Sequence, residues 1–215
     1  MTSEPGSEVV FSYRGGACVI VSTQGCTLVF DPGDLLSDEE IATLSGAVAV
    51  LFTQSLDDHF HARTTMKLVS MKGALVIGTS DVCKEVADFV PSSKLVELLP
   101  RRGVRVGPLR VFAIEGKHEV PVNLYYVTWG PSLFFAGDTG YVPLSKLKAQ
   151  LAFLPTGGSP FASPESSVRM ALDLEARYVV PIHGSGEEAK QVEELLSGKA
   201  KVIVPVPRRE YVVKF

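Results

Sequence analysis

Short apolar runs separated by turn residues dominate the first third of the chain. Three runs of β-type composition, divided by glycine-containing turns, predict strands over 9–13, 18–22 and 27–31. Ser37-Asp38-Glu39-Glu40 has the pattern of a capping box and predicts a short helix from there to about residue 44. The apolar run 47–53 has the length of a buried strand and leads directly into the polar segment 54–61.

Strands and helices continue to alternate along the rest of the chain. Helices are predicted over 63–73, 80–89, 163–174 and 187–196. Strands are predicted over 74–78, 96–99, 109–115, 124–127, 132–136, 151–154, 178–182, 201–206 and 211–215. No repeat, low-complexity tract or linker interrupts this order, so we expect a single domain over 1–215. Two β-rich halves that both carry helices predict an α/β sandwich.

Charge and hydrophobicity restrict the partners of the chain. The 21 basic and 24 acidic side chains give a net charge of −3, which argues against binding nucleic acid or an anionic membrane. The one basic cluster, Arg101–Arg105, is interpreted as a solvated turn, with an anion contact as the alternative. No apolar run approaches the ~20 residues that span a bilayer. Met1–Glu8 has no apolar core of a secretory signal, so we expect a cytoplasmic location.

The three cysteines, Cys18, Cys26 and Cys83, show no C-x-x-C spacing. A tight turn at Thr23-Gln24-Gly25 would pair Cys26 with Ser22 and place Cys18 opposite Phe30, so no cross-strand disulfide is expected. We predict buried, reduced thiols, in keeping with a reducing compartment.

Candidate metal ligands follow four of the predicted strands. They are Asp58 with His59, Asp138, His183 and His118. Imidazoles and carboxylates together suit zinc, iron or manganese. Each histidine alone is better explained as an ordinary surface or core residue, and Asp138 alone fits an Asx turn before Gly140 equally well. Their joint position at strand ends, where a rigid backbone meets a free loop, predicts a metal site.

Several short motifs follow one another along the chain in a characteristic order. They are Gly15-Gly16-Ala17 with Leu28-Val29-Phe30-Asp31-Pro32, the segment Thr53–His59, Gly116-Lys117-His118, Phe135–Tyr141 with Gly137-Asp138-Thr139-Gly140, Leu154–Gly158, and Pro181-Ile182-His183-Gly184. This series resembles the metallo-β-lactamase fold superfamily over nearly the whole chain. Within it, the series is most similar to the branch of the ascorbate-phosphate lactonases and the N-acyl phosphatidylethanolamine phospholipase D. The resemblance implies a four-layer αββα sandwich, with two β-sheets face to face and a pocket at one edge.

Four positions depart from the pattern of that superfamily. Its T-H-x-H-x-D-H motif has Gln54 and Leu56 in place of the first two histidines. Ser159 and Gly16 stand where the resemblance implies two further histidines. Of the first metal site, His118 is then the only histidine left.

The resemblance implies that the second metal site is kept. Its ligands would be Asp58, His59 and His183, with Asp138 as the usual bridging carboxylate. Leucine has no lone pair and glutamine only a weak amide oxygen, so we expect one divalent ion, zinc, with iron or manganese as alternatives. Such an ion lowers the pKa of water toward neutrality, and Asp58 and His118 are the predicted catalytic residues, with His118 polarising the substrate or carrying a proton. The prediction requires Asp58 and His183 within about 10 Å of each other.

His59-Phe60-His61 also spells H-x-H, but Ala62-Arg63 stand where this motif needs D-H. His61 is therefore interpreted as a peripheral residue, with a substitute ligand as the alternative.

Three functions are compatible with these residues. The first is a metal-dependent hydrolase acting on a small ester, lactone, phosphoester or amide. The alternative is a catalytically inactive member that binds no metal and serves in binding or assembly. The four substituted positions favour this alternative, and the intact second site opposes it. A nuclease is the third candidate, and the acidic charge weighs against it. The oligomeric state is left open.

Overall fold

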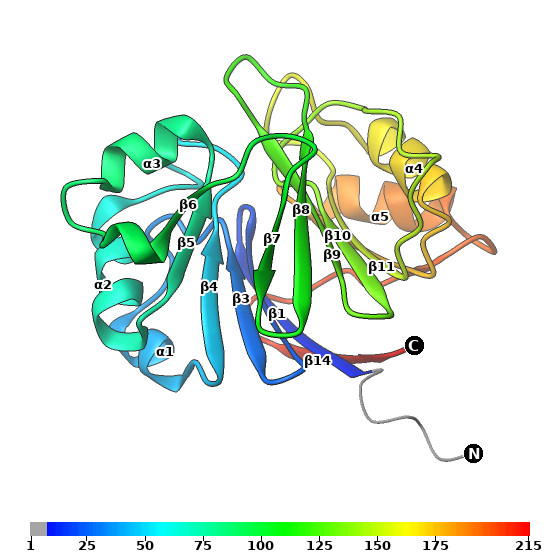
Figure 1. The fold of residues 1–215 in the computed structure, drawn as a ribbon. Helices are drawn as coiled ribbons and strands as arrows, with labels where there is room; N and C mark the ends of the chain where they lie inside the picture. Colours follow the sequence, from blue (N-terminus) through cyan, green and yellow to red (C-terminus); the bar gives the residue numbers. More distant parts are fainter. Residues whose placement is uncertain (1–7) are drawn as a thin grey trace.

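Two seven-stranded β-sheets form the centre of the molecule, which a computed structural model describes over residues 8–215 (Figure 1). The first sheet has the order β14-β1-β2-β3-β4-β5-β6. Its strands are β1 (Glu8–Gly15), β2 (Cys18–Thr23), β3 (Cys26–Phe30), β4 (Ala47–Leu51), β5 (Leu75–Gly78), β6 (Leu95–Glu97) and β14 (Glu210–Lys214). The pairs β3–β4, β4–β5 and β5–β6 are parallel, so the carboxyl ends of these strands meet at one edge.

The second sheet has the order β13-β12-β11-β10-β9-β8-β7. Its strands are β7 (Gly103–Val106), β8 (Leu109–Glu115), β9 (Asn123–Thr128), β10 (Ser132–Phe135), β11 (Leu151–Pro155), β12 (Tyr178–Ile182) and β13 (Lys201–Val202). Within this sheet, β10 pairs in parallel with β11, and β11 pairs in parallel with β12. Their continuous burial is typical of parallel strands covered on both faces.

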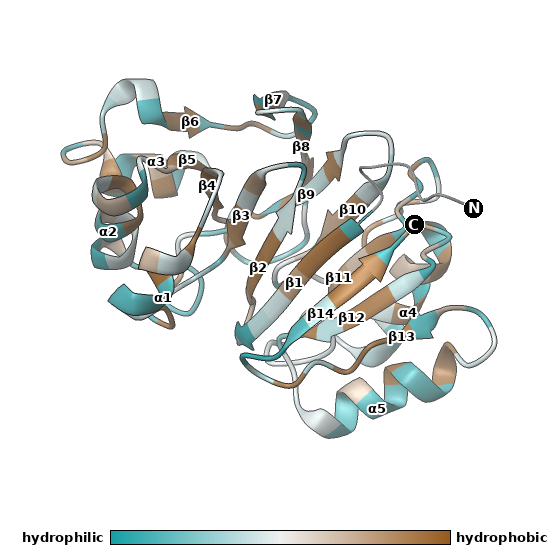
Figure 2. Ribbon diagram, turned by 90° about the horizontal axis from the view of Figure 1, so that it is seen from below, coloured by the Kyte–Doolittle hydropathy of each residue, from teal (hydrophilic) through white to brown (hydrophobic). Residues whose placement is uncertain are grey.

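Helices cover the outer face of each sheet (Figure 1). They are α1 (Asp38–Thr43), α2 (Ala62–Lys72) and α3 (Ser80–Val86) on the first sheet, and α4 (Pro164–Asp173) and α5 (Gly186–Leu195) on the second. A short 3₁₀ helix over Ser92–Lys94 precedes β6. Figure 2 shows brown, apolar segments concentrated on strands and teal, polar ones on the outer helices α2 and α5. This arrangement confirms the predicted αββα sandwich.

The largest apolar cluster lies between the two sheets and contains buried residues from both. Phe30 of the first sheet stacks on Phe135 of the second, with ring centroids 4.3 Å apart. Two smaller clusters join each sheet to its own helices. Burying a large aromatic side chain contributes roughly 1.5–3 kcal/mol. The inter-sheet cluster therefore fixes how the two halves meet, and with them the strand ends of the two sheets.

Two sequence predictions about the backbone are wrong. The segment Arg101–Arg105 is not only a turn, because Gly103–Val106 pairs with β8 as an edge strand. The hairpin of β2 and β3 pairs Thr23 with Cys26 and Ser22 with Thr27, one residue away from the predicted register. Its turn has two residues, Gln24 and Gly25, both at positive φ, as a type I′ turn requires.

The three cysteines are buried and unpaired, as predicted. Among residues 8–215, no helix has the length and apolar character needed to cross a membrane. The expectation about a secretory signal rests mainly on residues 1–7, which lie outside the described part of the chain.

Candidate metal centre

Asp31 directs the ring of His59. Asp31 follows β3, His59 lies in the loop after β4, and both are buried. The Asp31 carboxylate accepts hydrogen bonds from the backbone N–H of Thr53 at 2.7 Å and from its hydroxyl at 2.6 Å. Its Oδ2 also lies 2.9 Å from His59 Nδ1. A carboxylate on one ring nitrogen fixes the orientation of the imidazole and leaves the other nitrogen for a ligand.

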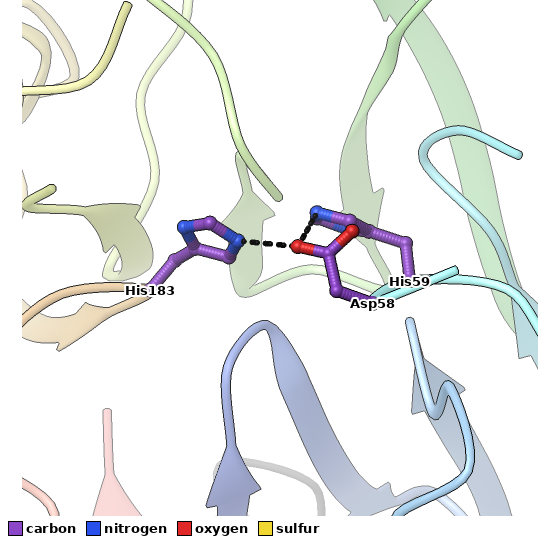
Figure 3. Close-up of side chains that lie close together, drawn as sticks. All are labelled: Asp58, His59 and His183. Atoms are coloured by element: carbon purple, nitrogen blue, oxygen red, sulfur yellow. Dashed lines mark hydrogen bonds and ion pairs between the residues drawn. The ribbon is translucent and has the colours of Figure 1, made fainter. Parts of the chain in front are cut away.

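His59, Asp58 and His183 form a compact group of donor atoms (Figure 3). One donor atom from each lies within 4.8 Å of the other two. Asp58 Oδ2 is 3.1 Å from His183 Nε2 and 3.5 Å from His59 Nε2. The two imidazoles stack with centroids 5.2 Å apart. The approach of Asp58 to His183 meets the distance requirement set by the sequence.

His59 Nε2 is buried and has no hydrogen-bond partner among the described residues. A buried polar atom without a partner costs about 1–3 kcal/mol, so native proteins rarely keep one unless a water or an ion completes it. This nitrogen faces a carboxylate and a second imidazole, which is the donor set that zinc prefers. The residues present therefore fit one divalent cation.

Backbone contacts hold His183 in place from two sides. Its backbone N–H donates to Gly16 O at 2.8 Å, which ties the end of β12 to the first hairpin. Its Nδ1 lies 3.0 Å from Gly157 O, and Gly157 N–H donates to His183 O at 3.1 Å. Gly158 has φ +83°, and a Cβ there would come within 2.5 Å of His183 Nδ1. The Gly157-Gly158 pair thus allows the loop to approach the imidazole.

The contact between Asp58 and His183 shifts the pKa values of both side chains. Burial by itself lowers the pKa of His183, but hydrogen bonds to Asp58 and to the Gly157 carbonyl, with the charges of Asp138 and Asp58, raise this pKa to about 9. The hydrogen bond from His183 holds the pKa of Asp58 below its ordinary value. Without a metal, the pair is therefore a carboxylate beside an imidazolium.

Asp138 faces a different set of partners. It follows β10, and its Oδ1 accepts the hydroxyl of Ser159 at 2.8 Å, while Oδ2 lies 3.3 Å from His118 Nε2. The segment before His118 is held against Thr139, because Lys117 N–H donates to Thr139 Oγ1 at 2.7 Å. Gly140 N–H donates in turn to Lys117 O at 2.9 Å. Asp138 is not part of the compact three-residue group.

The substituted positions lie around this centre without contributing donors to the group. Gln54 is fully buried, and both ends of its amide lack a hydrogen-bond partner within the described residues. Leu56 is partly exposed. His61 is exposed at the start of α2, with Nδ1 3.4 Å from Thr64 Oγ1. The substitute-ligand alternative for His61 gains no support from this position.

A cavity of about 450 Å³ opens beside His118. Its apolar wall is formed by Leu98, Leu99, Pro100, Val120, Pro121 and Val122. Asp81, Glu115 and Glu119 also line it, and no lysine or arginine is among its described lining residues. The cavity provides room for a small molecule next to a buried imidazole.

Sequence reasoning missed the orienting roles of Asp31 and Ser159. Asp31 ends an apolar strand and precedes Pro32, so the strand-end criterion applied to Asp138 could have found it. Ser159 carried no such signal, because its partner is reached only through the approach of two loops.

Comparison with known proteins identifies the family of the chain. Residues 11–183 match the family described as Beta-lactamase superfamily domain. The chain belongs to this family. It is 29% identical over 200 residues to a UPF0173 metal-dependent hydrolase of Geobacillus thermodenitrificans, covering 80% of this chain and 84% of that protein.

Solved structures show the same fold. Igni18, a metallo hydrolase of Ignicoccus hospitalis, superposes with a TM-score of 0.81 at 19% identity, over 97% of this chain and 99% of that one. YhfI, a metallo-β-lactamase fold protein of Bacillus subtilis, gives a TM-score of 0.74 at 13% identity, over 96% and 100%. These structures show the fold, and the family match over residues 11–183 confirms the superfamily. The narrower branch suggested by the sequence stays a prediction.

Proposed function

We propose that this protein is a metal-dependent hydrolase with one divalent ion held by Asp58, His59 and His183, and with Asp138 as the fourth ligand. The convergence of Asp58 and His183 on Nε2 of His59, which has no hydrogen-bond partner among the described residues, carries this proposal. Two imidazoles and carboxylates favour zinc, with iron or manganese as alternatives. An ion bound there supplies Lewis acidity and lowers the pKa of water toward neutrality.

Residues around the proposed ion position orient its ligands and can contact water and substrate. Asp31 keeps His59 in one orientation, and Gly157 does the same for His183. Asp58 has a side chain that is 60% exposed, so its carboxylate can accept a proton from an approaching water. His118 lines the cavity and can contact the substrate there.

The charge of the cavity favours some of the candidate substrate classes over others. Three carboxylate side chains and no lysine or arginine line it, which disfavours a phosphate group in this part of the pocket. A small carboxylic ester or lactone therefore fits better than a phosphoester. The apolar wall suits an uncharged alkyl or ring portion.

The inactive alternative has less support. A protein that served only in binding or assembly would gain nothing from a buried nitrogen that lacks a partner, since that atom costs stability. The relatives that match over most of the chain carry the name metal-dependent hydrolase.

Metal content tests the proposal directly. Wild-type protein purified without chelator should hold about one equivalent of zinc, iron or manganese by mass spectrometry, and His59→Ala should lose it. His61→Ala is the matched control, because His61 lies outside the group and should leave the metal content unchanged. The loaded protein should then hydrolyse p-nitrophenyl acetate or a γ-lactone faster than p-nitrophenyl phosphate. No metal after incubation with excess zinc or manganese would overturn the proposal.

A further inference from the structure

We propose that Ser159 is a positioning residue, which fixes the Asp138 carboxylate between its own hydroxyl and the imidazole of His118. The proposal concerns the side of the pocket that the three metal-binding donors do not occupy. It rests on the proposed function only where Asp138 is taken as a ligand.

The direction of the Ser159 hydrogen bond is fixed by its other contacts. Ser159 Oγ accepts the backbone N–H of Phe161 at 3.2 Å and of Ala162 at 3.3 Å. A hydroxyl has two acceptor positions and one hydrogen. With both acceptor positions used, its hydrogen points to Asp138 Oδ1 at 2.8 Å. Ser159 is therefore a dedicated donor to the carboxylate.

His118 is fixed in the same manner on the other oxygen. Its Nδ1 accepts the backbone N–H of Val120 at 3.5 Å, so the ring hydrogen resides on Nε2. That nitrogen lies 3.3 Å from Asp138 Oδ2. His118 Nε2 thus lies in contact with one oxygen of Asp138, while Ser159 donates a hydrogen bond to the other.

One loop supplies both supports. Ser159 and Phe161 follow β11 and are two residues apart, and the Phe161 ring packs against the His118 ring with centroids 4.8 Å apart. Asp138 and the His118 side chain are both buried, so solvent does not replace a lost contact. The loop after β11 therefore holds the rotamer of Asp138 through Ser159 and packs against the His118 ring through Phe161.

Removing the hydroxyl should free the carboxylate to rotate. Loss of an outer hydrogen-bond partner of a ligand typically weakens metal binding about 10- to 100-fold. We expect Ser159→Ala to weaken zinc binding at least about tenfold in competition with a chelating dye. Ser159→Thr keeps the hydroxyl and should bind within about threefold of wild type. Ser163→Ala removes the N-cap of α4 in the same region without touching Asp138, and is the matched control for a merely structural effect.

A second readout needs no metal. In metal-free protein, ¹⁵N NMR should show a shifted His118 Nε2 resonance in Ser159→Ala relative to wild type, because the freed Asp138 carboxylate moves away from that nitrogen. Ser159→Ala binding zinc within threefold of wild type, or Ser163→Ala weakening zinc as much as Ser159→Ala, would overturn the proposal. If wild type binds no zinc, the metal proposal fails, and the His118 Nε2 resonance alone decides. An unchanged His118 spectrum in Ser159→Ala then overturns the positioning role.

Discussion

The two sides of the pocket use the same kinds of side chain in opposite ways. On the ligand side, Asp58, His59 and His183 point donor atoms at one another, and one buried nitrogen has no hydrogen-bond partner. On the paired side, His118, Asp138 and Ser159 bind each other, and each is supplied with a partner. Only on the ligand side do the described residues leave a buried ring nitrogen without a hydrogen-bond partner, and we therefore place the ion there, with Asp138 reaching it from the paired side. Residue types alone do not distinguish the two sides.

The sharpest test compares one histidine from each side. His183→Ala removes a donor of the compact group and should lower zinc affinity by more than about 100-fold, beyond the loss typical of outer partners. His118→Ala should lower it by no more than about tenfold and leave the stoichiometry unchanged. Isothermal titration calorimetry on both variants measures affinity and stoichiometry. Loss of a whole equivalent in His118→Ala would show that the paired side also holds an ion.

Asp31→Ala tests how far the buried Asp31 carboxylate stabilises the ligand side through its contacts with Thr53 and His59. It leaves His59 and two donors of Thr53 buried without their carboxylate. Breaking such a buried group should lower the free energy of unfolding by about 3 kcal/mol and weaken zinc binding as well. Urea unfolding of the metal-free protein measures the first effect. Asp34→Ala, at an exposed position just beyond β3, is the control and should unfold within about 0.5 kcal/mol of wild type.

The pH dependence of the metal-free protein tests the Asp58–His183 pair. The pKa of His183 is raised to about 9 in the folded state, against about 6.5 in an unfolded chain. The pair's contribution is therefore fully present below pH ~6.5 and is lost as the pH rises to about 9. We expect this loss to be about 1–2 kcal/mol, because solvent screens the exposed Asp58. Wild type should lose this stability across the window in urea unfolding, and His183→Gln should not.

Gln54→Leu should have the smallest effect. The buried amide has no partner among the described residues, so an apolar side chain of similar size should leave the stability unchanged or raise it by about 1 kcal/mol. Zinc affinity should stay within about threefold of wild type. A large drop in zinc affinity at unchanged thermal stability would instead place Gln54 on the ligand side.

Local patterns in the sequence predicted most of the strand and helix positions. Strand ends could be read because apolar runs stop where polar residues begin, as they do before Asp58, Asp138 and His183. The edge strand after Arg101 was missed, because its short basic segment resembles a turn until β8 pairs with it. The hairpin register was wrong by one residue, because a two-residue turn at Gln24-Gly25 requires two positive φ angles that composition does not specify.

The sequence by itself determined the superfamily, the layers of the fold and the identity of the candidate ligands. Only the tertiary structure decided which of them meet. Asp58 and His183 are 125 positions apart, and their contact depends on the packing of two sheets and on the bond from His183 N–H to Gly16 O. The pairing of Asp138 with Ser159 and His118 depends likewise on three loops from different strands. Local sequence specifies where each strand ends, but the distances between strand ends follow from long-range packing and backbone hydrogen bonds.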